Sequence, residues 1–205
     1  MSLMTPEFKL ISEWITPNSR VLDLGCGDGT LLEHLIDTYD VTGYGMELDP
    51  TKNIQAMQKG LNVIQGNLNN LDLEDYFDAN SFDYVIMTQA LQVVGRPDEL
   101  LEDMLAIGKE IIITFPNFGH WRNRAQLLLK GRMPKTDTLP YQWFDTPNIH
   151  MCTFNDFETL CEDKDIEVVA RTVVNTEHRT SFGMRLAPNW LGEVALYKLQ
   201  RKSDT

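Results

Sequence analysis

Short apolar runs alternate with amphipathic stretches along most of this 205-residue chain. The apolar runs have the length of buried strands and lie at residues 20–24, 41–48, 61–65, 82–87 and 110–115. Between them, apolar residues recur at intervals of three and four, which predicts helices that begin near Thr30, Pro50 and Pro97. Strands and helices in this order indicate an α/β fold, with a mostly parallel sheet and helices on both faces.

The N-terminal and C-terminal parts of the chain add a helix and two strands to the predicted fold. Residues 5–15 predict an amphipathic helix that packs over the sheet edge or the ligand loop, with an apolar face of Phe8, Ile11, Trp14 and Ile15. Apolar runs at 166–174 and 193–199 predict the sixth and seventh strands. Residues 175–190 lie between them and are expected to pack as a loop over the active-site edge, with His178, Arg179 and Arg185.

A glycine-rich turn separates the first predicted strand from the next helix. Its glycines stand at alternate positions, Gly25, Gly27 and Gly29. Glycine lets the backbone approach a ligand, and the first N–H groups of a helix point toward it. A dinucleotide site has its third glycine one residue later, where this chain has Thr30. Asp23 and Asp28 place negative charge where a pyrophosphate would lie, so the turn favours a ligand with an ammonium group.

This G-x-G-x-G turn resembles motif I of the class I S-adenosylmethionine (SAM) methyltransferases; the alternative is a turn that serves packing alone. The resemblance implies SAM as the cofactor and S-adenosylhomocysteine as its product. Glu47 lies 22 residues beyond Gly25, at the end of the second strand, where an acid can accept hydrogen bonds from ribose hydroxyls. The residues expected to bind the cofactor are Asp23, Gly25, Cys26, Gly27, Gly29, Glu47, Leu48, Asn67, Leu68 and Gln89.

Asn67 departs from the methyltransferase pattern, which commonly has an acid after the third strand. Its side-chain oxygen can still accept a hydrogen bond from the adenine amino group, without a charge. Leu68 would supply an apolar wall for the base.

Charge and composition narrow the choice of partners. The net charge of −12 repels a phosphate backbone, so nucleic acid is not an expected partner. No run approaches the roughly 20 apolar residues of a membrane span, and the first residues lack a basic-then-apolar signal. The three cysteines, Cys26, Cys152 and Cys161, form no C-x-x-C pair, which favours a reducing, cytoplasmic compartment. Histidines and cysteines are too scattered to predict a metal site.

An aromatic and proline-rich segment follows the fifth predicted strand. The chain closely resembles the MetW family of bacterial methionine-biosynthesis proteins in three motifs, FPNFGHWRNRAQLLLKGRMP, LPYQWFDTPNIHMCTFNDFE and VLDLGCGDGTLL. The resemblance covers nearly all of residues 10–172 and fades after about Val173. It implies a Rossmann-like class I methyltransferase sheet of seven strands with an antiparallel last strand. The length of the chain predicts a single domain over residues 1–205, and the prolines and aromatics predict an ordered lid insertion at about 131–150.

The MetW resemblance implies a cytoplasmic protein that works with homoserine O-acyltransferase. Two functions stay open: SAM-dependent methylation of a small molecule, or a non-catalytic, regulatory SAM-binding subunit that associates with the acyltransferase. Methyl transfer needs a base only where the acceptor must lose a proton, and no catalytic constellation stands out. The candidate catalytic residues are His120, His150 and Tyr141, and the candidate substrate-pocket residues are Asn117, Trp121, Arg122 and Trp143.

The segment between Gly119 and Thr136 is basic and has no acidic residue. Its basic residues are Arg122, Arg124, Lys130, Arg132 and Lys135. Three interpretations are open: a solvated helix face, a surface for an acidic partner, or a site where Arg122 binds a substrate carboxylate. The second interpretation suits the implied link to an acyltransferase.

Overall fold

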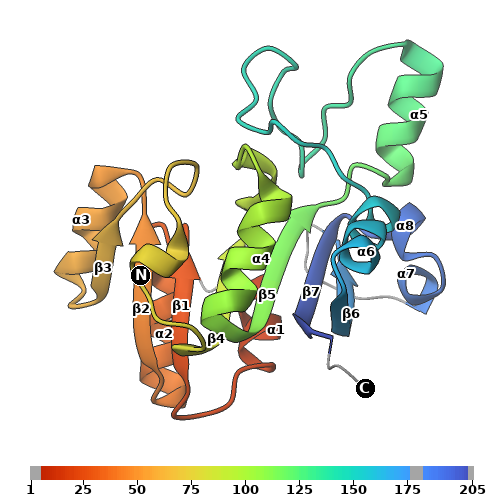
Figure 1. Ribbon diagram of the computed structural model, residues 1–205. Coiled ribbons are helices and arrows are strands. Elements are labelled where there is room, and N and C mark those ends of the chain that lie inside the picture. The colour runs from red at the N-terminus through yellow and green to blue at the C-terminus, as the bar shows by residue number, and fades with distance from the viewer. Residues whose placement is uncertain (1–5, 176–181, 203–205) are drawn as a thin grey trace.

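The computed structural model describes residues 6–175 and 182–202, whose strands form one seven-stranded sheet (Figure 1). The strands are β1 (Arg20–Leu24), β2 (Thr42–Glu47), β3 (Asn62–Gln65), β4 (Phe82–Thr88), β5 (Gly108–Pro116), β6 (Ile166–Val174) and β7 (Val194–Arg201). Their order across the sheet is β3-β2-β1-β4-β5-β7-β6. Six strands are parallel, and β7 runs antiparallel between β5 and β6. The predicted mixed sheet with an antiparallel last strand is confirmed.

Helices cover both faces of the sheet, as the alternating pattern predicted. They are α1 (Pro6–Ser12), α2 (Thr30–Tyr39), α3 (Pro50–Gln58), α4 (Pro97–Ile107), α5 (Trp121–Lys130), α6 (Phe154–Asp163), α7 (Phe182–Leu186) and α8 (Pro188–Leu191), with single 3₁₀ turns η1 (Leu73–Asp75) and η2 (Leu91–Val93). Successive side chains of a strand point to opposite faces. Val21 accordingly packs in one core with Ile11 of α1 and Leu32 of α2, while Leu22 packs in the other with Leu101 of α4.

Two segments differ from their predicted form. The first helix ends at Ser12, not Ile15, because residues 13–15 form tighter turns that still bury Ile15. The residues before β7 were expected to be a loop but contain the short helices α7 and α8, and Pro188 begins the second of them. His178 and Arg179 lie outside the described residues, and the structure describes only the backbone of Arg185.

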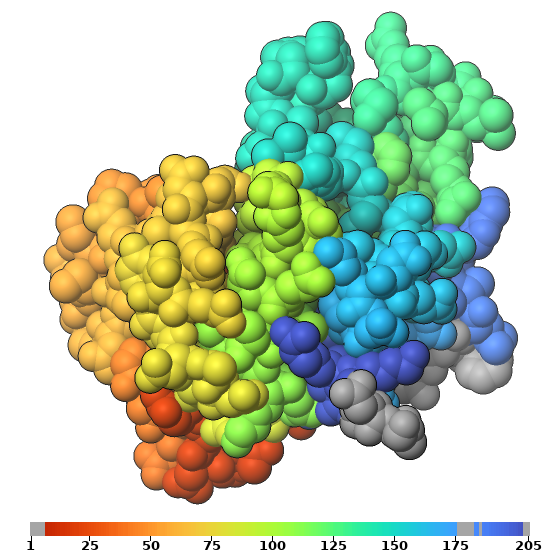
Figure 2. All heavy atoms as spheres, viewed as in Figure 1, coloured from red at the N-terminus to blue at the C-terminus, as the bar shows by residue number. Residues whose placement is uncertain are grey.

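The segment 131–153 contains no helix or strand and lies at the carboxyl edge of the sheet, beyond β5 and beside α5 (Figure 1). Figure 2 shows this segment and α5 as two projections above the body, with a hollow between them. Buried side chains of Pro134 and Leu139 anchor the segment, and the amides of Ile149 and His150 donate to the carbonyl oxygen of Gln92. The segment is therefore attached at several points along its length.

Candidate functional site

The glycine turn has the backbone conformation that its sequence predicted. Gly25, Gly27 and Gly29 have φ angles of 75°, 60° and 75°, in the left-handed region that favours glycine. A Cβ atom on Gly29 would lie 2.3 Å from Leu61 Cδ1, so a side chain there would force Leu61 to move. A Cβ atom on Gly27 would meet nothing within 4 Å. The backbone at Gly27 therefore faces open space that a ligand can fill.

Asp23 is a buried acid without a partner beside this turn. Its side chain is 1% exposed, and its Oδ1 atom accepts no hydrogen bond from the described residues. Burial, and then the nearby charge of Glu47, raise the pKa of Asp23 to about 7. A buried carboxylate without a partner costs free energy, and a ligand ammonium group would remove that cost.

Glu47 ties the end of β2 to the glycine turn. Its two carboxylate oxygens accept from the amides of Gly27, at 2.7 Å, and Asp49, at 2.8 Å. Each oxygen keeps a lone pair, so the side chain can also accept from ribose hydroxyls. Leu48, next in the chain, is 55% exposed. Glu47 and Leu48 therefore stand at the strand end where the sequence placed the ribose.

The carboxylate of Asp28 already has partners within the protein. Its Oδ1 atom accepts from the amide and hydroxyl of Thr30, and its Oδ2 atom lies 3.6 Å from Lys59 Nζ. Burial opposes ionisation, but these hydrogen bonds and Lys59 hold the pKa of Asp28 below its usual value. Of the two acids near the glycines, Asp23 is therefore the one available to a cationic ligand.

A hydrogen bond joins the turn after β3 to the loop after β4. Asn67 Oδ1 accepts from the amide of Asn69, and Asn69 Oδ1 accepts from the amide of Gly95 at 2.6 Å. One lone pair of Asn67 Oδ1 stays available for an adenine amino group. Leu68 is partly buried against the core. The expected contacts of Asn67 and Leu68 with adenine stay predictions.

Gln89 has a left-handed backbone, with φ of 53°, at the end of β4. Its amide donates to Thr114 of β5, and its side-chain Nε2 donates to Glu7 Oε2 at 3.2 Å. Glu7 is 5% exposed, and its Oε1 atom has no hydrogen-bond partner among the described residues. The sequence pattern did not single out Glu7, because only the fold brings α1 to this strand end.

A pocket of about 360 Å³, which we call the lid pocket, opens at the ends of β4 and β5. Its walls come from the ends of β4, β5 and β7 and from the segment above them: Gln89, Gln92, Val93, Pro116, Asp137, Thr138, Pro140, Tyr141, Pro147, Asn148 and Val194. Gln92 is 8% exposed, and its Oε1 atom has no partner among the described residues. Gln92 follows the end of the fourth predicted strand, whereas Asp137 belongs to no recognisable motif and carried no sequence signal.

Of the three candidate catalytic residues, Tyr141 lines the lid pocket and the two histidines do not. His150 Nε2 lies 3.2 Å from the carbonyl oxygen of Gly95. His120 is 5% exposed, at 4.0 Å from Glu193, and burial lowers its pKa although Glu193 opposes this effect. His120 therefore stays neutral near pH 7.

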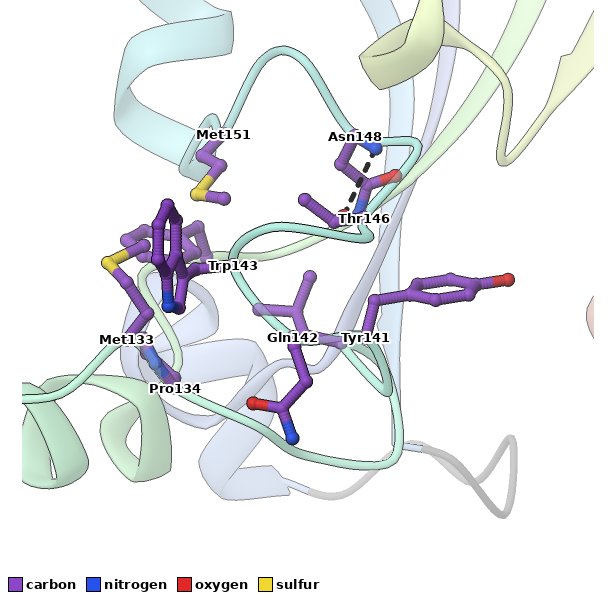
Figure 3. A pocket seen from close by; sticks show the side chains of 10 residues that line it. Met133, Pro134, Tyr141, Gln142, Trp143, Thr146, Asn148 and Met151 are labelled. Atoms are coloured by element: carbon purple, nitrogen blue, oxygen red, sulfur yellow. Dashed lines mark hydrogen bonds between the residues drawn. The ribbon is translucent and has the colours of Figure 1, made fainter.

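None of the four candidate substrate-pocket residues lines the lid pocket. Asn117 is fully buried, and its amide group bonds to the backbone of Asn189, Gly192 and Gly119. Arg122 lies over the Trp121 ring and 3.6 Å from Glu193. Trp143 lines a separate apolar slot, where its indole stands near the thioethers of Met133 and Met151 (Figure 3). These four residues shape the surroundings of the pocket or the surface beyond it.

The described residues contain no group of three or more His, Cys, Asp or Glu side chains that could hold a metal ion. Burial raises the pKa values of the thiols of Cys26, Cys152 and Cys161, which keeps them protonated and unreactive. No helix in the described ranges is long and apolar enough to cross a bilayer.

Solved structures share this fold at low sequence identity. A SAM-dependent methyltransferase from Mesorhizobium loti superposes with a TM-score of 0.70 at 14% identity, over 96% of this chain and 98% of that one. The [4+2]-cyclase SpnF superposes with a TM-score of 0.67 at 14% identity, over 97% and 81% of the two chains. These likenesses show the Rossmann-like methyltransferase fold, which by itself does not fix a reaction.

Sequence comparison gives the family. The bifunctional methionine biosynthesis protein MetXA/MetW of Rhodopirellula baltica is 36% identical over 159 residues, which are 73% of this chain and 25% of that protein. The chain spans about a quarter of the length of the curated relatives it matches. Residues 5–199 match the family model described as "Methionine biosynthesis protein MetW". The chain therefore belongs to the MetW family of methionine biosynthesis proteins.

Proposed function

We propose that this protein binds SAM at the glycine turn and presents the cofactor's methyl group to a small molecule in the lid pocket. The buried, unpartnered carboxylate of Asp23 carries the proposal, because it offers a cationic ligand a contact that nothing in the described chain supplies. The open backbone face at Gly27 and the carboxylate of Glu47 support the same ligand, through its methionine part and its ribose.

The lining of the lid pocket favours a neutral or cationic acceptor over an anionic one. Asp137 is the charged side chain among the described lining residues, and no Lys, Arg or His is among them. The carboxylate of Glu7 lies behind Gln89, and the unpartnered Gln92 Oε1 atom can accept a hydrogen bond. Bound SAM supplies an electrophilic methyl group, so the chain has mainly to orient the acceptor and exclude water. Tyr141 and Asp137 would hold a hydroxyl or amino group of the acceptor there.

A second candidate function is a regulatory SAM-binding subunit of homoserine O-acyltransferase. The R. baltica relative supports it, because its name joins MetXA and MetW in one protein. The lack of a histidine in the described lining of the lid pocket also fits a subunit without turnover. Both candidates need SAM at the same turn, so binding is tested first and turnover second.

The binding test is a calorimetric titration of the protein with SAM and with S-adenosylhomocysteine. Glu47→Gln keeps one acceptor oxygen but loses the charge, and we expect it to weaken binding by about tenfold or more. Glu162→Gln removes an exposed acid of α6 and serves as the matched control, with unchanged affinity expected. Wild-type protein that binds neither compound would refute both candidate functions.

The turnover test measures S-adenosylhomocysteine released from SAM in the presence of neutral, cationic and anionic metabolite fractions. Release that depends on a neutral or cationic fraction, and that Tyr141→Phe or Asp137→Asn reduces, supports the methyltransferase. Tight SAM binding without release in any fraction favours the regulatory subunit. Release that requires the anionic fraction would contradict the acceptor chemistry argued from the pocket lining.

A further inference from the structure

α5 exposes an apolar surface and packs only lightly on the other described elements. Leu127, Leu128 and Leu129 in its last turns are 47%, 84% and 80% exposed. The helix makes no extended contact with another described helix or strand, and Asn123 is its buried residue. An isolated helix of ten residues is marginal in water, so α5 gains stability from whatever covers it.

The neighbouring segment also exposes large apolar side chains. Met133, Trp143 and Phe144 are 42%, 73% and 69% exposed, and Met133 and Trp143 line the slot of Figure 3. We call these three residues and Leu127, Leu128 and Leu129 the docking face. Figure 2 shows the two projections that carry it standing clear of the body, with a hollow between them. These exposed side chains stand on two neighbouring projections, and large exposed apolar side chains in one region of a surface mark interfaces.

Three exposed cations border the docking face. Lys130, Arg132 and Lys135 are exposed, and none forms an ion pair with a described residue. Arg122 and Arg124 are different, because Arg122 pairs with Glu193 and Arg124 lies 4.7 Å over the Trp190 ring. The surface therefore fits a partner that presents apolar side chains with an acidic rim.

We propose that the docking face binds homoserine O-acyltransferase. This inference rests on the second candidate function, and it names the surface and the chemistry of that association. In the R. baltica relative, MetXA and MetW belong to one chain, which holds the two parts at high local concentration. A second copy of this chain fits less well, because a symmetric dimer through the same face would bring Lys130, Arg132 and Lys135 of both copies together.

The same segment links the docking face to the lid pocket. Tyr141 and Asn148 line both the slot of Figure 3 and the lid pocket. An acyltransferase bound at the docking face would therefore contact the segment that forms one wall of the lid pocket.

The test is the double variant Leu128→Gln and Leu129→Gln, measured against homoserine O-acyltransferase of the same organism by calorimetry and size-exclusion chromatography. Glutamine keeps helix propensity, so the variant removes apolar surface without breaking α5. We expect affinity for the acyltransferase to fall at least about 30-fold, the loss from one hot-spot side chain, with SAM binding unchanged. Ile54→Gln with Met57→Gln is the matched control, since these α3 residues are 54% and 56% exposed.

Three results would overturn the proposal. Unchanged acyltransferase affinity in the α5 variant would place the interface elsewhere. Wild-type protein that binds SAM but not the acyltransferase would remove the partner and leave the SAM site intact. Self-association that the α5 variant abolishes, without acyltransferase binding, would make a second copy the occupant. Acyltransferase binding without SAM binding would refute the function proposed for the glycine turn and leave the docking face in place.

Discussion

Replacing Asp23 by Asn removes a buried carboxyl group whose ionisation destabilises the folded protein when no ligand is bound. Burial and Glu47 raise the pKa of Asp23 from 3.8 to about 7. One pKa unit corresponds to about 1.4 kcal/mol, so a shift of about three units is worth about 4 kcal/mol when the group is fully ionised. Asparagine has the shape of the protonated acid and does not ionise. At pH 8 the free energy of unfolding of the variant should therefore exceed that of wild type by up to about 4 kcal/mol, so the variant is the more stable protein.

Proton binding by Asp23 determines how the stability of wild type changes with pH. Between about pH 4 and pH 7 the unfolded chain loses the Asp23 proton, whereas the folded chain keeps it. Ionisation then favours the unfolded state, so the Asp23 contribution to the free energy of unfolding falls as pH rises through this window. Below about pH 4 both states are protonated, and the wild type and the variant should have similar stability.

Urea unfolding of apo wild type and Asp23→Asn, at pH values from 4.5 to 8, measures this difference. Asp83→Asn is the control with the opposite sign, because hydrogen bonds from Arg20 and Lys109 lower the pKa of Asp83. That control should lose stability above about pH 4. A gap between wild type and Asp23→Asn that does not grow with pH, or a variant less stable at pH 8, would refute the buried-charge reasoning.

The glycine turn and His120 allow three further tests. SAM affinity should rise by up to about tenfold per unit as pH increases toward about 7, because an ammonium ligand favours ionised Asp23; calorimetry at constant ionic strength should show it, and a flat profile would separate Asp23 from the ligand. Gly29→Ala should lower the melting temperature more than Gly27→Ala, since only the first meets Leu61, while Gly27→Ala should weaken SAM binding; equal effects on both readouts would contradict the assigned roles. His120→Gln should abolish the fall in stability that wild type shows as pH drops below about 6.5, because burial lowers the His120 pKa and glutamine takes up no proton; unfolding at pH 7 and pH 5.5 checks this, and an equal fall in both proteins would contradict it.

The sequence predicted the parts of the site that depend on local pattern. The glycines and Glu47 could be placed because a turn and a strand end follow from neighbouring residues. Glu7 and Gln89 are 82 residues apart, and only the packing of α1 on the sheet brings their side chains together. The aromatic segment raised the expectation that Trp143 walls a substrate pocket. Aromatic composition does not reveal which side chains of an irregular segment point toward the protein. Trp143 is largely exposed and does not line the lid pocket.

The position of β7 has a consequence for synthesis. During translation β5 emerges about 80 residues before β7, its eventual neighbour on that side. Until β7 arrives, the apolar edge at Ile111–Phe115 has unpaired backbone groups, which is the kind of edge that pairs with other chains. A nascent chain of this protein therefore passes through an aggregation-prone stage, in which we expect chaperones of the ribosome exit site to bind it.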